Sequence, residues 1–244
     1  TTYRQICAQV AREFNLIACF MSKPFMGVSA NGCHTNVSLW KGGELKSTPI
    51  GNDPLPGMEQ VFTHISGGEN MFMPDPKIDE VKPGPVGLQS IAGLLKHLPA
   101  LTCLGSPTVN SYRRLWDTGF WAPVYADWGY QNRTCSVRVS APGRVEYRSV
   151  DSSHNPYLMG AGILKAFEDG LDNKMDPGEP EKKNIYDAMK EGKEVDKLPL
   201  TLGEAIQRLD SDDVIKSALP EDMLRVFMHY KNDEWEKFLS AVTQ

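Results

Sequence analysis

The chain has 244 residues, of which 41% are hydrophobic and 23% charged, and its formal net charge at pH 7 is −5. This composition is typical of a globular domain with a substantial core, and the acidic balance argues against a surface built to bind nucleic acid. No apolar run reaches the roughly 18 residues of a membrane-spanning helix, so we expect no membrane partner. The five cysteines lack CxxC spacing, which favours reduced thiols in a cytoplasmic protein over a disulfide framework or a zinc site.

The first forty residues predict a helix followed by two strands. Ile6, Val10 and Phe14 recur every four residues, which is the spacing of one helical face. No initiating Met precedes this helix, so we expect the chain to be cut from a longer one. Strands are predicted over 16–25 and 34–40, with a loop rich in small residues at 26–33 between them.

The middle of the chain changes character twice. Residues 41–85 contain seven of the 17 prolines, and we predict irregular loop there because proline is excluded from helix interiors and central strands. Helical spacing returns over 86–105, where Pro99 is expected to break or kink the helix. Residues 110–151 combine alternating apolar positions with many arginines, which predicts strands.

From residue 155 onward the pattern is helical. Asn155-Pro156 is a favourable helix start, Thr201 and Glu204 form a capping box, and Pro220 opens a last helix. Strands in the first part and helices in the second predict an α+β fold rather than alternating βαβ units.

The arginines are concentrated in one part of the chain. Six of the ten lie within 36 residues: Arg113, Arg114, Arg133, Arg138, Arg144 and Arg148. With a strand period of two, Arg144, Glu146 and Arg148 project from the same face. Guanidinium groups match the geometry of carboxylates and phosphates, so the cluster favours an anion-binding site. A structural network of ion pairs is the alternative.

The predicted strand 34–40 carries polar side chains on one face, those of His34, Asn36 and Ser38. His34 and Glu146 could together ligate a divalent cation, with Asn36 and Ser38 left for hydrogen bonds. Two candidate ligands fall short of a complete metal site. A histidine with a purely structural role is the alternative.

Short motifs around these residues closely resemble the glutamine synthetase family. They are KPF at 23–25, the loop before His34 and Ser38, NSYRRL at 110–115, APV at 122–124, NR at 132–133, RVEYR at 144–148 and NPYL at 155–158. They follow the family order over most of residues 16–178. The resemblance implies an α+β catalytic domain with an antiparallel-rich curved sheet and flanking helices. It also implies that residues 1–244 are the C-terminal part of that domain, with the N-terminal β-grasp domain and the first metal-binding carboxylates outside this chain.

The resemblance assigns roles to three groups of residues. His34 and Glu146 are the implied ligands of Mg²⁺ or Mn²⁺. The residues implied to contact ATP are Asn36, Ser38, Arg133 and Arg138, although Asn36 stands where the family commonly has a histidine. The residues implied to bind glutamate are Arg114, Arg148 and, through their backbone, Ser29 and Ala30. Arg133 is also the implied catalytic residue, because it would neutralise charge on the transferred phosphoryl group.

The resemblance implies a glutamate–ammonia ligase. ATP phosphorylates the γ-carboxylate of glutamate, and ammonia then displaces phosphate to form glutamine. One position departs from the family, because Trp121 stands where its flap carries a glutamate in a Gly-aromatic-Glu-Ala-Pro run. Trp121 either walls a pocket for an amine or packs under the flap, so a ligase that forms a γ-glutamylamide from a small amine is the alternative. A non-catalytic structural or binding protein is the third hypothesis.

The resemblance also implies a cytoplasmic homo-oligomer, a dodecamer of stacked rings whose active sites lie between neighbouring subunits. Tyr186 falls in the region where some bacterial members are adenylylated, but the sequence that follows it differs from theirs. We therefore expect no regulation at Tyr186.

Overall fold

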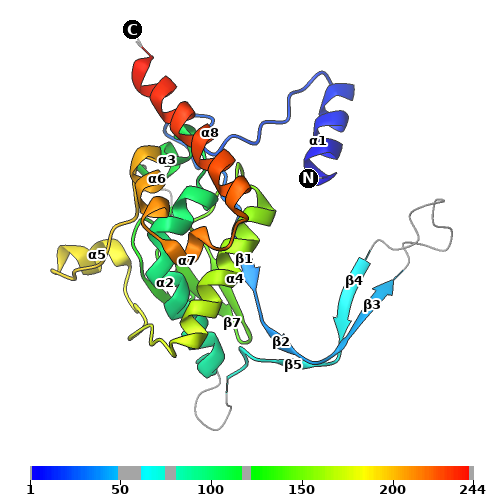
Figure 1. Ribbon diagram of the computed structural model, residues 1–244, viewed down its shortest axis with the longest axis vertical. Coiled ribbons are helices and arrows are strands. Elements are labelled where there is room, and N and C mark those ends of the chain that lie inside the picture. Colours follow the sequence, from blue (N-terminus) through cyan, green and yellow to red (C-terminus); the bar gives the residue numbers. More distant parts are fainter. Residues whose placement is uncertain (1, 49–61, 75–80, 117–121, 242–244) are drawn as a thin grey trace.

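The computed structural model describes residues 2–48, 62–74, 81–116 and 122–241. These residues form an α+β domain in which a mixed sheet packs against a layer of helices, and a long two-stranded arm extends away from both (Figure 1). The predicted fold class is therefore confirmed. No helix in this part of the chain is both long and apolar enough to cross a membrane.

The central sheet has the strand order β1 (Thr35–Val37), β8 (Arg144–Tyr147), β7 (Val137–Ala141), β6 (Trp128–Tyr130). The β1–β8 and β8–β7 pairs are antiparallel, and β6 runs parallel to β7. The register places Glu146 opposite Asn36 on one side and opposite Arg138 on the other. Glu146 thus lies on an inner strand, flanked on both sides by backbone.

Alternation along β7 and β8 separates an apolar face from a charged one. Val137, Val139, Val145 and Tyr147 are buried in the core, and β7 and β8 contact helix α2. Because successive side chains of a strand point to opposite faces, the intervening Arg138 and Glu146 project from the other face. The same alternation that builds the core therefore presents charge on the side where the candidate site lies.

Helices α2 (Pro85–Gly105) and α4 (Pro156–Asp172) form the centre of the helical layer. They approach so closely that a Cβ on Gly93 would lie 2.0 Å from the carbonyl oxygen of Ala166, and one on Gly170 would lie 2.2 Å from that of Gln89. Neither position has room for a side chain. Around this pair lie α6 (Leu202–Asp210), α7 (Asp213–Lys216) and α8 (Glu221–Ser240), which contact α2, α4 or one another.

The predicted helix starts in the second half are confirmed. The Asn155 side chain accepts a hydrogen bond from the backbone N–H of Tyr157 at 2.9 Å. Thr201 Oγ1 accepts one from the N–H of Glu204 at 3.1 Å, while the Glu204 carboxylate accepts one from the N–H of Leu200 at 2.8 Å. The first two bonds satisfy donors that a helix start leaves free, and the third ties the residue before the cap to the helix. A short helix, α5 (Ile185–Lys190), lies between α4 and α6 along the chain.

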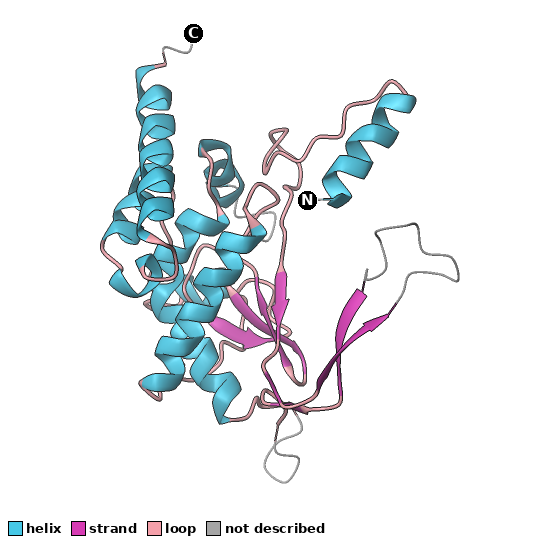
Figure 2. Cartoon of the chain, turned by 45° about the vertical axis from the view of Figure 1, so that its right-hand side comes forward, coloured by secondary structure: helices cyan, strands magenta, loops and turns pink. Residues whose placement is uncertain are grey.

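The prediction of irregular loop over residues 41–85 is wrong in part. Strands β2 (Trp40–Lys41) and β5 (Glu69–Asn70) pair with each other, as do β3 (Glu44–Thr48) and β4 (Phe62–Ser66), and together they make the arm (Figure 2). None of the four strands contains a proline. The prolines lie between these strands and beyond them. The high average proline content of the segment therefore led to a prediction of loop, although its proline-free stretches pair as strands.

Residues 109–116 form a helix, α3 (Val109–Trp116), where strand was predicted. Tyr112 and Leu115 are both buried, and their spacing of three residues suits one face of a helix. Helix α2 also runs through Pro99, which costs it about 3 kcal/mol. Leu98 and Leu101 beside it are fully buried and offset that cost at about 1.5–3 kcal/mol each.

The N-terminal helix is confirmed as α1 (Thr2–Glu13), but residues 16–25 do not form the predicted strand. No described segment pairs with them, and the side chain of Ile17 is 93% exposed. A strand requires a partner to satisfy its backbone groups, so β-propensity alone did not decide this segment. Helix α1 stands apart from the helical layer (Figure 1) and contains no buried residue.

Candidate active site

A pocket of about 710 Å³ is formed by residues of the sheet, of α3 and of the loops before β1 and between β6 and β7. Its lining consists of Ala30, Gly32, His34, Arg114, Arg133, Arg138, Glu146 and Arg148. Half of these residues are arginines, and Glu146 is the one carboxylate among them. The pocket therefore has a strongly positive wall.

Glu146 is buried and is surrounded by three basic groups. Its carboxylate lies 2.5 Å from Arg138 Nε, 3.2 Å from His34 Nδ1 and 3.4 Å from Arg148 Nη1. A buried carboxylate without partners would be very costly. Arg138 is its cross-strand neighbour in β7, and Arg148 follows two residues later on the same face. Strand pairing thus places positive charge directly beside the Glu146 carboxylate.

His34 is held in its neutral form. Burial lowers the pKa of His34 to about 4, and the positive charges of Arg148, Arg114 and Arg138 act in the same direction against the pull of Glu146. A neutral imidazole is the form that binds metal ions. At pH 7 His34 and Glu146 therefore offer a nitrogen and a carboxylate oxygen 3.2 Å apart.

This pair fits a divalent cation of the kind that binds together with phosphates. Mg²⁺ in phosphoryl-transfer sites takes one or two protein ligands and fills its remaining positions with phosphate oxygens and water. Among the residues that the structure describes, no group of three or more His, Cys, Asp or Glu side chains could hold an ion. Among the described residues of the pocket, His34 and Glu146 are therefore the two side chains that could ligate such an ion.

Arg114 and Arg148 each carry a buried hydrogen-bond donor without a partner among the residues that the structure describes. Arg114 is buried, and its Nη2 donates to the carbonyl of Arg148 at 3.2 Å. Its Nη1 and the Nε of Arg148 are buried without a partner. Burial lowers the pKa of both guanidinium groups, which nevertheless remain charged. Each unused donor costs about 1–3 kcal/mol, a cost that a bound carboxylate or phosphate would offset.

Gly32 lines this pocket, although the sequence pointed only to the loop of small residues that contains it. A Cβ at this position would lie 3.1 Å from His34 Nε2 and 3.3 Å from Arg114 Nη2. Gly32 forms a β-bridge with Asp151, and the N–H of Cys33 donates to the carbonyl of Val150 at 3.0 Å. The loop is thereby held against residues 150–151, which follow β8, and a Cβ at Gly32 would be tight against both side chains. The sequence signal was the Asn-Gly step two residues before His34.

Several expected site residues do not line the pocket. Ser38 accepts a hydrogen bond from Trp40 Nε1 at 2.9 Å, and Asn36 is exposed on the edge strand β1. Arg144 sits at the β7–β8 turn, where its Nε donates to Ser140 Oγ at 3.1 Å. Ser29 is exposed in the loop. Trp121 lies outside the described residues.

Arg133 reaches the pocket from an unusual connection. The parallel strands β6 and β7 are joined by only six residues, 131–136, and Arg133 lies in the middle of them with an exposed side chain. The sequence showed an arginine in a polar segment, but the pairing of two parallel strands across so short a loop was visible only in the structure.

The sequence matches, over residues 1–244, the family described as glutamine synthetase, catalytic domain. The glutamine synthetase of Pyrococcus furiosus is 38% identical over 250 residues, a match that covers 100% of this chain and 50% of the relative. The glutamine synthetase of Archaeoglobus fulgidus is 39% identical over 250 residues, which covers 99% of this chain and 46% of the relative. The chain therefore spans about half the length of the curated relatives it matches.

Two solved structures of a protein named GmaS resemble the whole chain. The unliganded form has a TM-score of 0.81 and is 32% identical, covering 100% of this chain and 50% of that one. The complex of GmaS with ADP has a TM-score of 0.82 at 32% identity, covering 100% of this chain and 51% of that one. The resemblance therefore extends from sequence motifs to the full arrangement of helices and strands.

Proposed function

The chain belongs to the glutamine synthetase catalytic-domain family, and we propose that it supplies part of the active site of an ATP-dependent ligase that joins ammonia to the γ-carboxylate of glutamate. The observation that carries this proposal is the pocket itself. A buried carboxylate and a neutral histidine face four arginines there. The substrates of such a ligase are anions, a carboxylate and a nucleoside triphosphate, and this wall is complementary to both.

The reaction consists of two displacements. An oxygen of the γ-carboxylate attacks the γ-phosphorus of ATP, the bond to the β-phosphate oxygen breaks, and ADP leaves. The nitrogen of ammonia then attacks the acyl carbon of γ-glutamyl phosphate, phosphate leaves with the C–O bonding pair, and the nitrogen loses a proton. The first step depends chiefly on positioning and on neutralising charge.

The residues of the pocket divide between these tasks. We assign Arg133 and Arg138 to the phosphates of ATP and Arg133 to the group in transfer. We assign Arg114 and Arg148, whose buried donors have no partner within the described part of the chain, to the substrate carboxylate. His34 and Glu146 would hold Mg²⁺ or Mn²⁺, which when bound offsets phosphate charge. A similar fold that binds ADP, that of GmaS, supports a nucleotide site.

The proposal is tested by assaying release of ADP from the full-length protein. We expect release that requires ATP, glutamate and an amine together. If the protein releases no ADP with glutamate and any amine tested, the ligase proposal fails and the non-catalytic alternative is favoured.

A γ-glutamylamide ligase is the second candidate, and the residue that favours it is Trp121. An indole cannot accept a proton from ammonium as a carboxylate does, but its π face attracts an alkylammonium ion. Such a contact contributes about 0.5–2 kcal/mol, which corresponds to roughly a two- to thirtyfold preference. We therefore expect Trp121→Glu to raise the ratio of kcat/KM for ammonia to that for methylamine. An unchanged ratio with both activities intact would assign Trp121 to packing.

We also propose that the whole protein is a cytoplasmic homo-oligomer of stacked rings, a dodecamer, as the family relationship suggests. This proposal rests on the family alone.

A further inference from the structure

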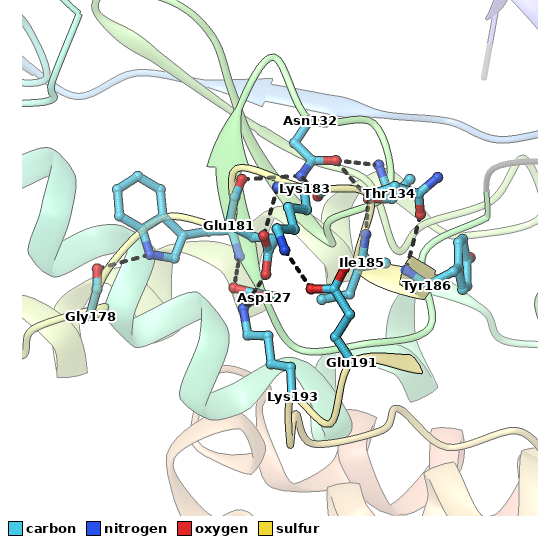
Figure 3. A network of polar contacts seen from close by, with 12 residues as sticks. Asp127, Asn132, Thr134, Gly178, Glu181, Lys183, Ile185, Tyr186, Glu191 and Lys193 are labelled. Carbon is cyan, nitrogen blue, oxygen red and sulfur yellow. Dashed lines mark hydrogen bonds and ion pairs between the residues drawn. The ribbon is translucent and has the colours of Figure 1, made fainter. Parts of the chain in front are cut away.

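The two neighbours of Arg133 bind a distant segment of the chain. Asn132 Nδ2 donates to the carbonyl of Glu181 at 3.1 Å and to that of Lys183 at 2.7 Å. Thr134 Oγ1 accepts a hydrogen bond from the N–H of Ile185 at 3.0 Å. Figure 3 shows both side chains meeting the segment 181–185. The backbone on each side of Arg133 is therefore attached to the same external support.

Asn132 and Thr134 also bind each other across Arg133. Asn132 Oδ1 accepts from the N–H of Thr134 at 3.0 Å and from its Oγ1 at 2.6 Å. Thr134 is buried and Asn132 is half-buried. The amide nitrogen and oxygen of Asn132 and the hydroxyl and N–H of Thr134 are thus all used within the protein. The two side chains therefore have no role left in binding a ligand directly.

The supporting segment is itself tied to β6. The N–H of Glu181 donates to the carbonyl of Trp128 at 2.8 Å. Lys193 Nζ lies 2.6 Å from both Asp127 Oδ2 and Glu181 Oε2 (Figure 3). Gly129 allows this contact, because a Cβ there would lie 2.5 Å from the carbonyl oxygen of Glu181. Residues 181–193 thus form a brace fixed to the strand from which the Arg133 loop departs.

This arrangement contrasts with Arg133 itself, which has an exposed side chain at the rim of the pocket. A long side chain loses considerable rotamer freedom when it binds an anion. If the backbone already holds the Cα of Arg133 in place, only the side chain has to be ordered when the anion binds. A small displacement of a positioned charge also lowers the rate of a catalysed reaction strongly. Holding the loop is therefore a means of keeping the guanidinium within reach of its ligand.

We propose that Asn132 and Thr134 are positioning residues that act through Arg133, by clamping its loop to the 181–185 segment. The inference rests on the proposed function in taking a phosphate of ATP as the group that Arg133 meets. If the same bonds only stabilised the fold, removing them would leave ADP affinity unchanged or would lower it equally with and without Arg133.

The test compares matched variants of the full-length protein. Thr134→Val removes the hydroxyl at constant shape, Thr134→Ser retains it, and Asn132→Ala removes the amide. Lys183→Ala is the control, because Lys183 is exposed and Asn132 uses only its backbone carbonyl. For each variant the affinity for ADP is measured by calorimetry, kcat and KM for ATP by ADP release, and thermal stability by circular dichroism.

We expect T134V and N132A to weaken ADP binding by about five- to tenfold, a part of the tenfold or greater effect of one charge-assisted contact. T134S and K183A should stay within about twofold of the unaltered protein. The decisive comparison is a double-mutant cycle. In an Arg133→Ala background, N132A should change ADP affinity by less than about twofold, because its effect passes through the missing side chain.

Two results would overturn the proposal: unchanged ADP affinity in N132A and T134V, or the same fold loss with and without Arg133. If N132A does not fold, the T134V and T134S pair decides the question in the same cycle. Because ADP affinity is measured without turnover, a failure of the ligase assay would refute the proposed function without deciding this inference.

Discussion

Glu146 is the residue on which the charge balance of the pocket depends. It lies within 3.4 Å of Arg138, Arg148 and His34, so it both neutralises arginines and offers an oxygen to a cation. A substitution at this position should therefore affect the reaction through electrostatics even where the shape is unchanged.

We predict that Glu146→Gln lowers kcat on the order of a hundredfold or more, the scale of losing one preorganised electrostatic group. The amide has the shape of the carboxylate but cannot carry its charge, and Arg138 and Arg148 lose their counterion. ADP release by the full-length protein measures the effect. Glu168→Gln on α4, which breaks only a surface ion pair with Lys165, is the control. An E146Q variant as active as E168Q would exclude Glu146 from the site.

At position 32 the neighbouring side chains limit the size of the residue that fits. A methyl group would come within 3.1 Å of His34 and 3.3 Å of Arg114, so both side chains would have to shift by a few tenths of an ångström. We predict that Gly32→Ala raises KM for glutamate several-fold and leaves the melting temperature nearly unchanged, because the strain falls on the open pocket.

The matched control for Gly32→Ala is Gly160→Ala. Gly160 lies in α4, and outside its own helix no atom lies within 4 Å of the position that a Cβ would take there. Alanine at this position should therefore stabilise the protein by about 0.4–1 kcal/mol without affecting KM. Steady-state kinetics and thermal unfolding of the two variants separate the effects. Equal KM values in both would show that Gly32 has no steric role.

Among the elements, α2, α4 and α7 are joined by a buried ionic triad. His97 of α2 lies 2.8 Å from Asp169 of α4 and 2.6 Å from Asp212, the N-cap of α7. Burial disfavours the charged imidazolium, but hydrogen bonds to Asp212 and Asp169 outweigh it and raise the pKa of His97. For both carboxylates burial is likewise outweighed, and their hydrogen bonds lower the pKa.

The sign of the pH dependence follows from these shifts. Because the pKa of His97 is raised on folding, its contribution to stability is fully present below pH 6.5 and is lost as the pH rises through the folded value. The two carboxylates contribute above their ordinary pKa of 3.8, and lose that contribution as the pH falls through their lowered values. The triad should therefore stabilise the helical layer most between about pH 4 and pH 6.5.

We predict that His97→Gln lowers the free energy of unfolding by about 3 kcal/mol near pH 6, the cost of removing one partner from a buried ionic group. The difference from the unaltered protein should shrink as the pH is raised. Denaturant unfolding at pH 6 and pH 9 measures it. His229→Gln, on the exposed side of α8, should show no such trend. A deficit independent of pH would mean that His97 acts by packing alone.

For the whole molecule, the family relationship predicts assembly. Helix α1 exposes Ile6 and Val10 at 52% and 46% of their surface, and Phe14 directly after it is 69% exposed. Exposed apolar stripes of this kind commonly mark contact surfaces. We predict that light scattering on the full-length protein gives the mass of a large homo-oligomer. A monomer at micromolar concentration would contradict the prediction.

Local interactions explain why some of the fold could be predicted from the sequence. The caps at Asn155 and Thr201 and the alternation of valines in β7 and β8 each involve residues within a few positions of one another. Helix α3 and the arm were misjudged for a different reason. The secondary structure of these segments depends on which of their residues are buried and on which other segments pair with them. Both are set by contacts with distant parts of the chain and not by the segment's own sequence.

The sequence by itself determined the family, the α+β class and the chemical nature of the site, because those depend on which residue types occur and in what order. The resemblance already named Arg114, Arg133, Arg138 and Arg148, and only the tertiary structure showed how they come together around Glu146. Arg138 is there because β7 pairs with β8 in one register, Arg114 because α3 is a helix, and Arg144 is absent because it falls at the turn. Register, helix placement and turn position are set by contacts between residues far apart in the chain, and a linear pattern does not contain them.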